Sequence, residues 1–202
     1  LSPYQEIFYN EWKLNPQRSD YNIVIDNTLR GPFDPIRLSQ ALQRLSQDYF
    51  LLQSRVIETE EGYYWARQHG LSIAFDYMDI PRTEAELLAY ARMPFNLETG
   101  PLWKVGLVKL AEQHFRLIIV IHHLIIDGRK ISFVFETLPH YYNDATYQLD
   151  MSVAEQSQEL EKLSHFLSNQ LSMNETNHLK FWRNQLTDLS GPDLRFLKNN
   201  SC

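Results

Sequence analysis

Two helices and a strand are predicted in the first 45 residues from the spacing of apolar side chains. Ser2 and Pro3 are typical of a helix N-cap and a first helical position, and apolar residues then recur along one stripe. Residues 22–29 alternate between apolar and polar side chains, which predicts a strand that ends at Gly31. Residues 34–45 predict a second helix, because Asp-Pro precedes apolar residues at helical spacing.

A hairpin, a further strand and a short helix are predicted next. Residues 53–57 and 63–67 are typical of two paired strands around a turn that contains Gly62. Residues 71–78 predict another strand, and residues 82–92 predict a helix of two to three turns. This part of the chain therefore mixes both kinds of element.

The densest apolar segments lie in the middle of the chain. Residues 102–110 and 114–122 predict two strands joined by the polar residues 111–113, as in a hairpin at the centre of a sheet. A largely buried helix is predicted after Gly128, and the chain from Ser152 onward is helical and polar. Because strands and helices do not alternate regularly, the pattern predicts an α+β layered domain rather than a doubly wound sheet.

The composition narrows the class of protein without identifying it. A chain of 202 residues, 44% of them hydrophobic, can bury a sizeable core as one large or two small domains. A net charge of −6 and the lack of a basic run argue against nucleic-acid binding. The one cysteine, Cys202, cannot form an internal disulfide, which fits a reducing compartment.

Membrane insertion and export are not indicated by the sequence. The longest apolar run, residues 117–121, is far too short to cross a bilayer, and the first residues show no export signal. We therefore expect a soluble cytoplasmic protein without a membrane partner. The first residue is not Met, which is compatible with a fragment of a longer chain.

The candidate chemistry is concentrated at the end of the second central strand. His122 and His123 are adjacent, and neighbouring side chains of an extended segment point to opposite faces. One imidazole would face the protein interior, and the other could face a cavity as a general base near Asp127. Gly128 would allow a tight turn into the next helix. The pattern alone also fits a strand end whose two histidines have no chemical role.

Other chemistries are less well supported by the residues. Two adjacent histidines on a strand cannot easily converge on one zinc ion, and no cysteine or third histidine lies nearby. The seven scattered glycines do not form a phosphate-binding loop, a dinucleotide fingerprint or a nucleophile elbow. We therefore predict no bound metal or cofactor.

Residues 122–128 match HHxxxDG, and with this motif the chain resembles the condensation domains of nonribosomal peptide synthetases and related acyltransferases. Further segments resemble motifs of the same family in the same order along nearly the whole chain. These are LSPxQ at residues 1–5, YNI…LxGxLD at 21–34, ALxxALxxL at 38–45, FDLxxGPL at 95–102 and YWxxxL at 181–186.

Two departures from the family pattern concern residues around the signature. The family's RHExLRTxF falls on residues 48–56, where Gln53 replaces the arginine that often pairs with the signature aspartate. Arg55 shares a strand face with that position by the two-residue period, so Arg55 could still reach Asp127. The signature is followed by Arg129 rather than by the WS or VS usual in the family.

The resemblance implies a chloramphenicol-acetyltransferase-like layered sheet flanked by helices, as one lobe of a two-lobe domain. Residues 1–190 would be the N-terminal, donor-side lobe, and residues 191–202 would begin the linker to a second lobe. It also implies amide formation, with His123 in a tunnel as the base or positioning group and His122 turned inward. Asp127 would hold the loop through an ion pair, and Gly128 would place an N–H near the reacting centre.

The implied partners are carrier proteins, the second lobe and neighbouring synthetase domains of antibiotic or other secondary-metabolite biosynthesis. The substrates would be acyl or aminoacyl thioesters on carrier phosphopantetheine, with no cofactor bound directly. An isolated lobe would leave His123 open to water, so we predict little activity for the chain alone. A divergent stand-alone acyltransferase and a non-catalytic carrier-docking lobe remain alternatives.

Overall fold

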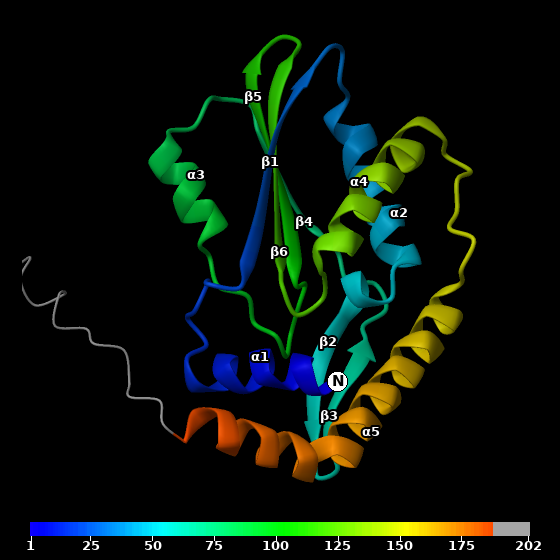
Figure 1. Cartoon of the computed structure of the whole chain (residues 1–202). Coiled ribbons are helices and arrows are strands. Elements are labelled where there is room, and N and C mark those ends of the chain that lie inside the picture. Colours follow the sequence, from blue (N-terminus) through cyan, green and yellow to red (C-terminus); the bar gives the residue numbers. More distant parts are fainter. Residues whose placement is uncertain (188–202) are drawn as a thin grey trace, which may run out of the picture.

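The computed structural model of the chain describes residues 1–187 and centres on a mixed four-stranded sheet (Figure 1). The strands lie in the order β1, β6, β5 and β4, with β1 antiparallel to β6 and β6 antiparallel to β5. The edge strand β4 runs parallel to β5. The bounds are β1 (Asn22–Arg30), β4 (Ala74–Met78), β5 (Trp103–Ala111) and β6 (His114–His122).

The two apolar segments in the middle of the chain form the two central strands, as predicted. Every residue from Leu117 to His122 in β6 is buried, because both faces of this strand are covered. The edge strand β1 is less buried, and half-buried and exposed residues alternate in it from Ile23 to Asp26. Strand β4 begins at Ala74 rather than at residue 71, and it is the shortest strand of the sheet.

Helices cover both faces of the sheet (Figure 1). Helices α2 (Pro35–Asp48) and α4 (Gly128–Asn143) pack together on one face, and α3 (Glu84–Ala91) lies on the other. Helix α2 buries Leu38, Leu42 and Leu45, whose three- and four-residue spacing was the sequence signal for this helix. The layered α+β fold expected from the sequence is confirmed.

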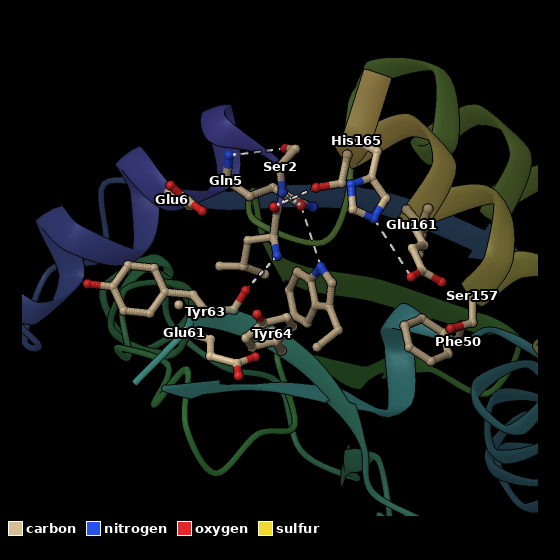
Figure 2. Close-up of a pocket in the computed structure, with 15 residues that line it drawn as sticks. Ser2, Gln5, Glu6, Phe50, Glu61, Tyr63, Tyr64, Ser157, Glu161 and His165 are labelled. Carbon is tan, nitrogen blue, oxygen red and sulfur yellow. Dashed lines mark hydrogen bonds and ion pairs between the residues drawn. The ribbon is translucent and has the colours of Figure 1, made fainter. Parts of the chain in front are cut away.

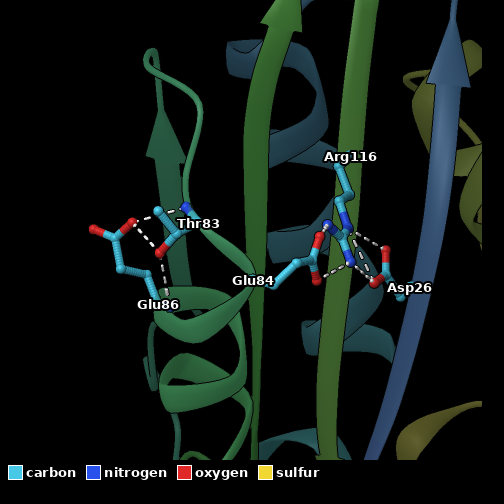
Figure 3. Close-up of polar contacts among 5 residues, drawn as sticks. All are labelled: Asp26, Thr83, Glu84, Glu86 and Arg116. Carbon is cyan, nitrogen blue, oxygen red and sulfur yellow. Dashed lines mark hydrogen bonds and ion pairs between the residues drawn. The ribbon is translucent and has the colours of Figure 1, made fainter.

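Helix α3 is held to the sheet at its first turn by the guanidinium of Arg116 (Figure 3). Arg116, on β6, donates to the carboxylate of Asp26 on the neighbouring β1, at 2.6 Å, and also to Glu84 at the first residue of α3. The carboxylate of Glu86 accepts from the backbone N–H of Thr83, which closes a capping box at the same end.

The C-terminal end of α3 is also attached to the sheet. Lys104 of β5 donates to the carbonyl of Tyr90 at 2.6 Å, and Asn22 of β1 donates to the carbonyl of Ala91 at 2.9 Å. A cation at the C-terminal end of a helix satisfies carbonyls that have no partner within the helix. Both ends of this short helix are therefore fixed to the main sheet.

The predicted hairpin is confirmed as a separate two-stranded sheet formed by β2 (Ser54–Thr59) and β3 (Gly62–Arg67). The turn requires glycine because Gly62 has a φ of 136°. A single 3₁₀ turn, η1 (Leu51–Gln53), leads into β2. Helix α1 (Pro3–Leu14) crosses the end of the main sheet, next to this hairpin (Figure 1).

The helical segment after residue 152 forms one continuous helix, α5 (Val153–Leu186), which lies against α1. Its amphipathic stripe is only partly covered, and Phe166 and Trp182 are more than half exposed. Among residues 1–187, no helix is long and apolar enough to cross a membrane. The predicted linker at residues 191–202 lies outside the described residues.

Candidate functional site

The paired histidines lie where the central strand β6 leaves the sheet. His122 is the last residue of β6 and is 3% exposed, whereas His123 is exposed. Their backbone N–H groups bond in opposite directions, His122 to the carbonyl of Leu102 at 2.9 Å and His123 to that of Tyr21 at 2.8 Å. The alternation of the two side chains expected from the sequence is therefore present in the structure.

His122 is neutral and hydrogen-bonded in the interior. Its Nδ1 accepts the backbone N–H of Leu124 at 3.1 Å, and its ring meets the rings of Tyr21 and Phe95 nearly edge-on. Burial and, to a smaller extent, the neighbouring His123 lower the pKa of His122 to about 4. A neutral imidazole that accepts a backbone N–H stabilises the turn after the strand and leaves His123 as the imidazole open to a substrate.

His123 presents its imidazole at the surface, with one side covered by helix α1. The ring of Phe8 stacks on it with a centroid distance of 5.4 Å and an angle of 17° between the planes. Gln5, one turn earlier in α1, donates its amide to the carbonyl of Leu124 at 3.1 Å. Helix α1 therefore contacts the signature at two points.

No role at the site could be predicted from the sequence for Gln5 or Phe8. Gln5 lies within the LSPxQ motif, and Phe8 is one residue of the apolar stripe of the first helix. Gln5 also completes a capping box with Ser2, which the sequence pattern at this helix start could have indicated. No local pattern could place Phe8 against an imidazole 115 positions away.

Asp127 caps helix α4. Its carboxylate accepts the backbone N–H of Lys130 at 2.9 Å, and its own carbonyl accepts that of Ile131 at 3.0 Å. Gly128 is the first residue of the helix. A carboxylate at this position satisfies a free N–H of the first turn and lies favourably in the field of the helix.

The expected ion pair between Arg55 and Asp127 is not formed among the residues that the structure describes. Arg55 lies in β2, and its guanidinium donates to the carbonyl of Glu98 at 2.9 Å. Val56 of the same strand donates its backbone N–H to the carbonyl of Leu97 at 2.8 Å, so β2 is bonded twice to the loop at residues 95–101. The hairpin thus packs on the 95–101 loop and not on the signature, which a strand period alone could not predict.

The cap that Asp127 forms on α4 is expected to contribute to the stability of the fold. Replacing Asp127 by alanine removes the acceptor for Lys130 and is expected to lower the free energy of unfolding by about 1 kcal/mol. Asparagine keeps an acceptor oxygen at the same place, so Asp127→Asn is expected to stay within a few tenths of a kcal/mol of the wild type. Urea unfolding of the three proteins measures this difference. Equal destabilisation by both variants would show that the charge matters, as in an ion pair.

An apolar cavity of about 460 Å³ lies behind the signature. Ile125 and Ile126 line one side of it, and η1, α4 and α5 contribute most of the remaining side chains. Its lining, within the described part of the chain, does not include His123.

A second cavity, of about 310 Å³, lies at the junction of α1, β3 and α5 (Figure 2). Ser2 and Gln5 come from the start of α1, Tyr63 from the hairpin, and Glu161 and His165 from α5. The backbone carbonyl of Leu1 accepts the hydroxyl of Ser164 of α5 at 2.7 Å. These contacts join α5 to the helix that touches His123.

Within residues 1–187, no three His, Cys, Asp or Glu side chains are grouped as metal ligands.

Comparison with known proteins identifies similar sequences and folds. A family model described as "Condensation domain" matches residues 1–199. Cyclosporin synthetase simA of Tolypocladium inflatum is 35% identical over 121 residues, which are 58% of this chain and 1% of that protein. Tyrocidine synthase 2 of Brevibacillus parabrevis is 31% identical over 134 residues, which are 65% of this chain and 4% of that protein.

Solved structures share the fold at low sequence identity. The starter condensation domain of rhizomide synthetase RzmA superposes with a TM-score of 0.73 at 20% identity, covering 95% of this chain and 48% of that domain. The four-domain nonribosomal peptide synthetase holo-AB3403 gives the same TM-score and identity, over 92% of this chain and 14% of that protein. The chain therefore spans about half of a solved condensation domain and a small part of the synthetases.

Proposed function

Because the chain belongs to the condensation-domain family, we propose that residues 1–190 act as the N-terminal, donor-side lobe of a condensation domain in a nonribosomal peptide synthetase. The lobe would help to form an amide bond between acyl or aminoacyl groups held as thioesters on carrier proteins. The observation that carries this proposal is the exposed imidazole of His123 beside the buried, neutral His122.

In the proposed reaction the amine of the acceptor attacks the carbonyl carbon of the donor thioester. A carbon–nitrogen bond forms, the carbon–sulfur bond breaks, and the proton lost by nitrogen ends on the departing thiol of phosphopantetheine. His123 would hold the amine or accept its proton, while His122 and Asp127 fix the loop. The backbone N–H of Gly128 would lie near the reacting carbonyl. Alignment of two bound reactants can itself account for effective molarities on the order of 10⁵ M.

We further propose that a second lobe covers the open side of His123. Two findings support it: this imidazole is exposed, and the chain covers 48% of a solved condensation domain. A base open to water on one side holds its substrate poorly, because water competes for every hydrogen bond. We therefore propose that the 202-residue chain alone forms little or no amide.

An assay with loaded carrier proteins tests the proposal. Donor and acceptor carriers, with loading verified by mass spectrometry, are mixed with the chain alone and, separately, with the chain joined to a second lobe. We expect the condensed product on the acceptor carrier only in the second reaction. Product from the chain alone would contradict the inactive-lobe proposal.

Two other outcomes separate the alternative functions. Carrier binding by the two-lobed protein without product, measured by calorimetry, would favour a docking lobe over an enzyme. Acyl transfer from the donor thioester to a free amine or alcohol, but not to a carrier-bound amine, would favour a stand-alone acyltransferase. Either result would overturn peptide-bond formation as the function.

A further inference from the structure

Helix α1 forms a wall along one side of the exposed imidazole. Phe8 lies in the second turn of this helix, and its ring is nearly parallel to that of His123 at a centroid distance of 5.4 Å. This distance and angle fall in the range in which offset aromatic rings attract each other. The ring of Phe8 therefore restricts the orientations of the imidazole and leaves its opposite side to solvent.

Phe8 is itself held from the other side by Tyr21. The two rings meet edge to face, with centroids 4.7 Å apart and an angle of 87°. The carbonyl of Tyr21 also accepts the backbone N–H of His123 at 2.8 Å. One residue therefore fixes both the main chain of His123 and the ring that stacks on its side chain.

Tyr21 is fixed in turn by two charged groups. Its hydroxyl donates to Glu11 of α1, and this hydrogen bond raises the pKa of Tyr21, which keeps the hydroxyl protonated as a donor. Arg18 donates to the same carboxylate at 2.8 Å, and its guanidinium lies 5.2 Å from the centre of the Tyr21 ring. A continuous set of contacts thus runs from Arg18 and Glu11 through Tyr21 and Phe8 to His123.

We propose that Phe8 is a positioning residue for His123, because it holds the imidazole edge toward the face where the two thioesters would meet. This inference rests on the proposed function, since it assigns Phe8 a part in the same reaction. A side chain that only fills the core would tolerate any apolar residue of similar size. A positioning ring would tolerate another aromatic residue but not an aliphatic one.

The first experiment uses this chain and does not depend on activity. The carbon-bound ring protons of His123 are observed by NMR in the wild type and in Phe8→Leu, Phe8→Trp and Tyr21→Phe, with His123→Gln to assign the signal. We expect Phe8→Leu to shift these protons downfield, because the ring current is lost, and Phe8→Trp to retain an upfield position. Tyr21→Phe keeps both rings and removes only the hydroxyl, so it shows whether the hydrogen bond to Glu11 is needed for the stack. Unchanged positions in Phe8→Leu would overturn the stack and leave the proposed function standing.

The second experiment measures the reaction in the two-lobed protein. Phe8→Leu is expected to lower kcat about tenfold with little change in KM for the carriers. The reason is that a misaligned imidazole of His123 would stabilise the transition state less well. Phe8→Trp is expected to restore most of kcat. A shifted NMR signal with wild-type kcat would overturn the positioning role. If His123→Ala also had wild-type kcat, His123 would have no part in the reaction and the proposed function would be contradicted, which is a separate result.

Discussion

Replacing His123 by alanine is expected to slow amide formation by about 10²- to 10⁴-fold in the two-lobed protein, because a positioned general base contributes that much. The loss should appear in kcat, with KM for the loaded carriers nearly unchanged, since an interaction made only in the transition state contributes to kcat and not to KM. His123 is exposed, so the variant is expected to fold normally. Single-turnover measurement of product on the acceptor carrier gives the rate.

A glutamine at position 123 separates the two roles that the imidazole could have. Glutamine can donate and accept hydrogen bonds but cannot take up a proton at neutral pH. A rate close to that of the alanine variant would identify His123 as a base, whereas a rate close to wild type would identify it as a positioning group. Wild-type rates in both variants would remove His123 from the mechanism.

The second large effect concerns the stability of the fold in acid. The pKa of His122 is about 4 in the folded protein, lowered chiefly by burial, against about 6.5 in an unfolded chain. Below pH 6.5 the unfolded state therefore binds a proton that the folded state does not. The contribution of neutral His122 to the free energy of unfolding is fully present above about pH 7 and is lost as the pH falls toward 4. The difference in pKa corresponds to about 3 kcal/mol.

Urea unfolding between pH 7 and pH 4 measures this contribution when two variants are compared. His122→Asn keeps an acceptor for the N–H of Leu124 but does not titrate, so its free energy of unfolding should fall less steeply with pH than that of the wild type. His123→Asn removes only the smaller cause of the lowered pKa of His122, so its slope should stay closer to that of the wild type than the slope of His122→Asn does. Identical slopes in all three proteins would show that His122 is not the titrating group.

Local sequence patterns predicted the elements but not how they meet. The six-residue buried run of β6 and the alternation of its last residue with His123 follow from spacing alone. The parallel pairing of β4 with β5 could not be predicted, because the sequence of a short strand does not indicate the direction of the neighbouring strand. Helix caps at Ser2 and Asp34 were visible for the same local reason.

In the candidate site, too, the local motif could be predicted from the sequence, whereas the contacts between distant segments could not. The four candidate residues, His122, His123, Asp127 and Gly128, lie within seven consecutive positions, so their motif could be recognised directly. Arg55 was expected at Asp127 on strand period, yet the hairpin that carries it forms its own sheet and binds Glu98. The partners that do hold the signature, Gln5 and Phe8, come from the far end of the sequence, where only tertiary packing places them.

The opposed backbone bonds of His122 and His123 bear on how the amides of this region exchange with deuterium. The amide of His122 is bonded toward β5 and that of His123 toward Tyr21, next to β1, so neither can open without separating a central strand from a neighbour. Exchange at these two amides is therefore expected to be slow, although the side chain of His123 is in contact with solvent. A side chain that is open to solvent on one side would thus be carried by a protected stretch of main chain.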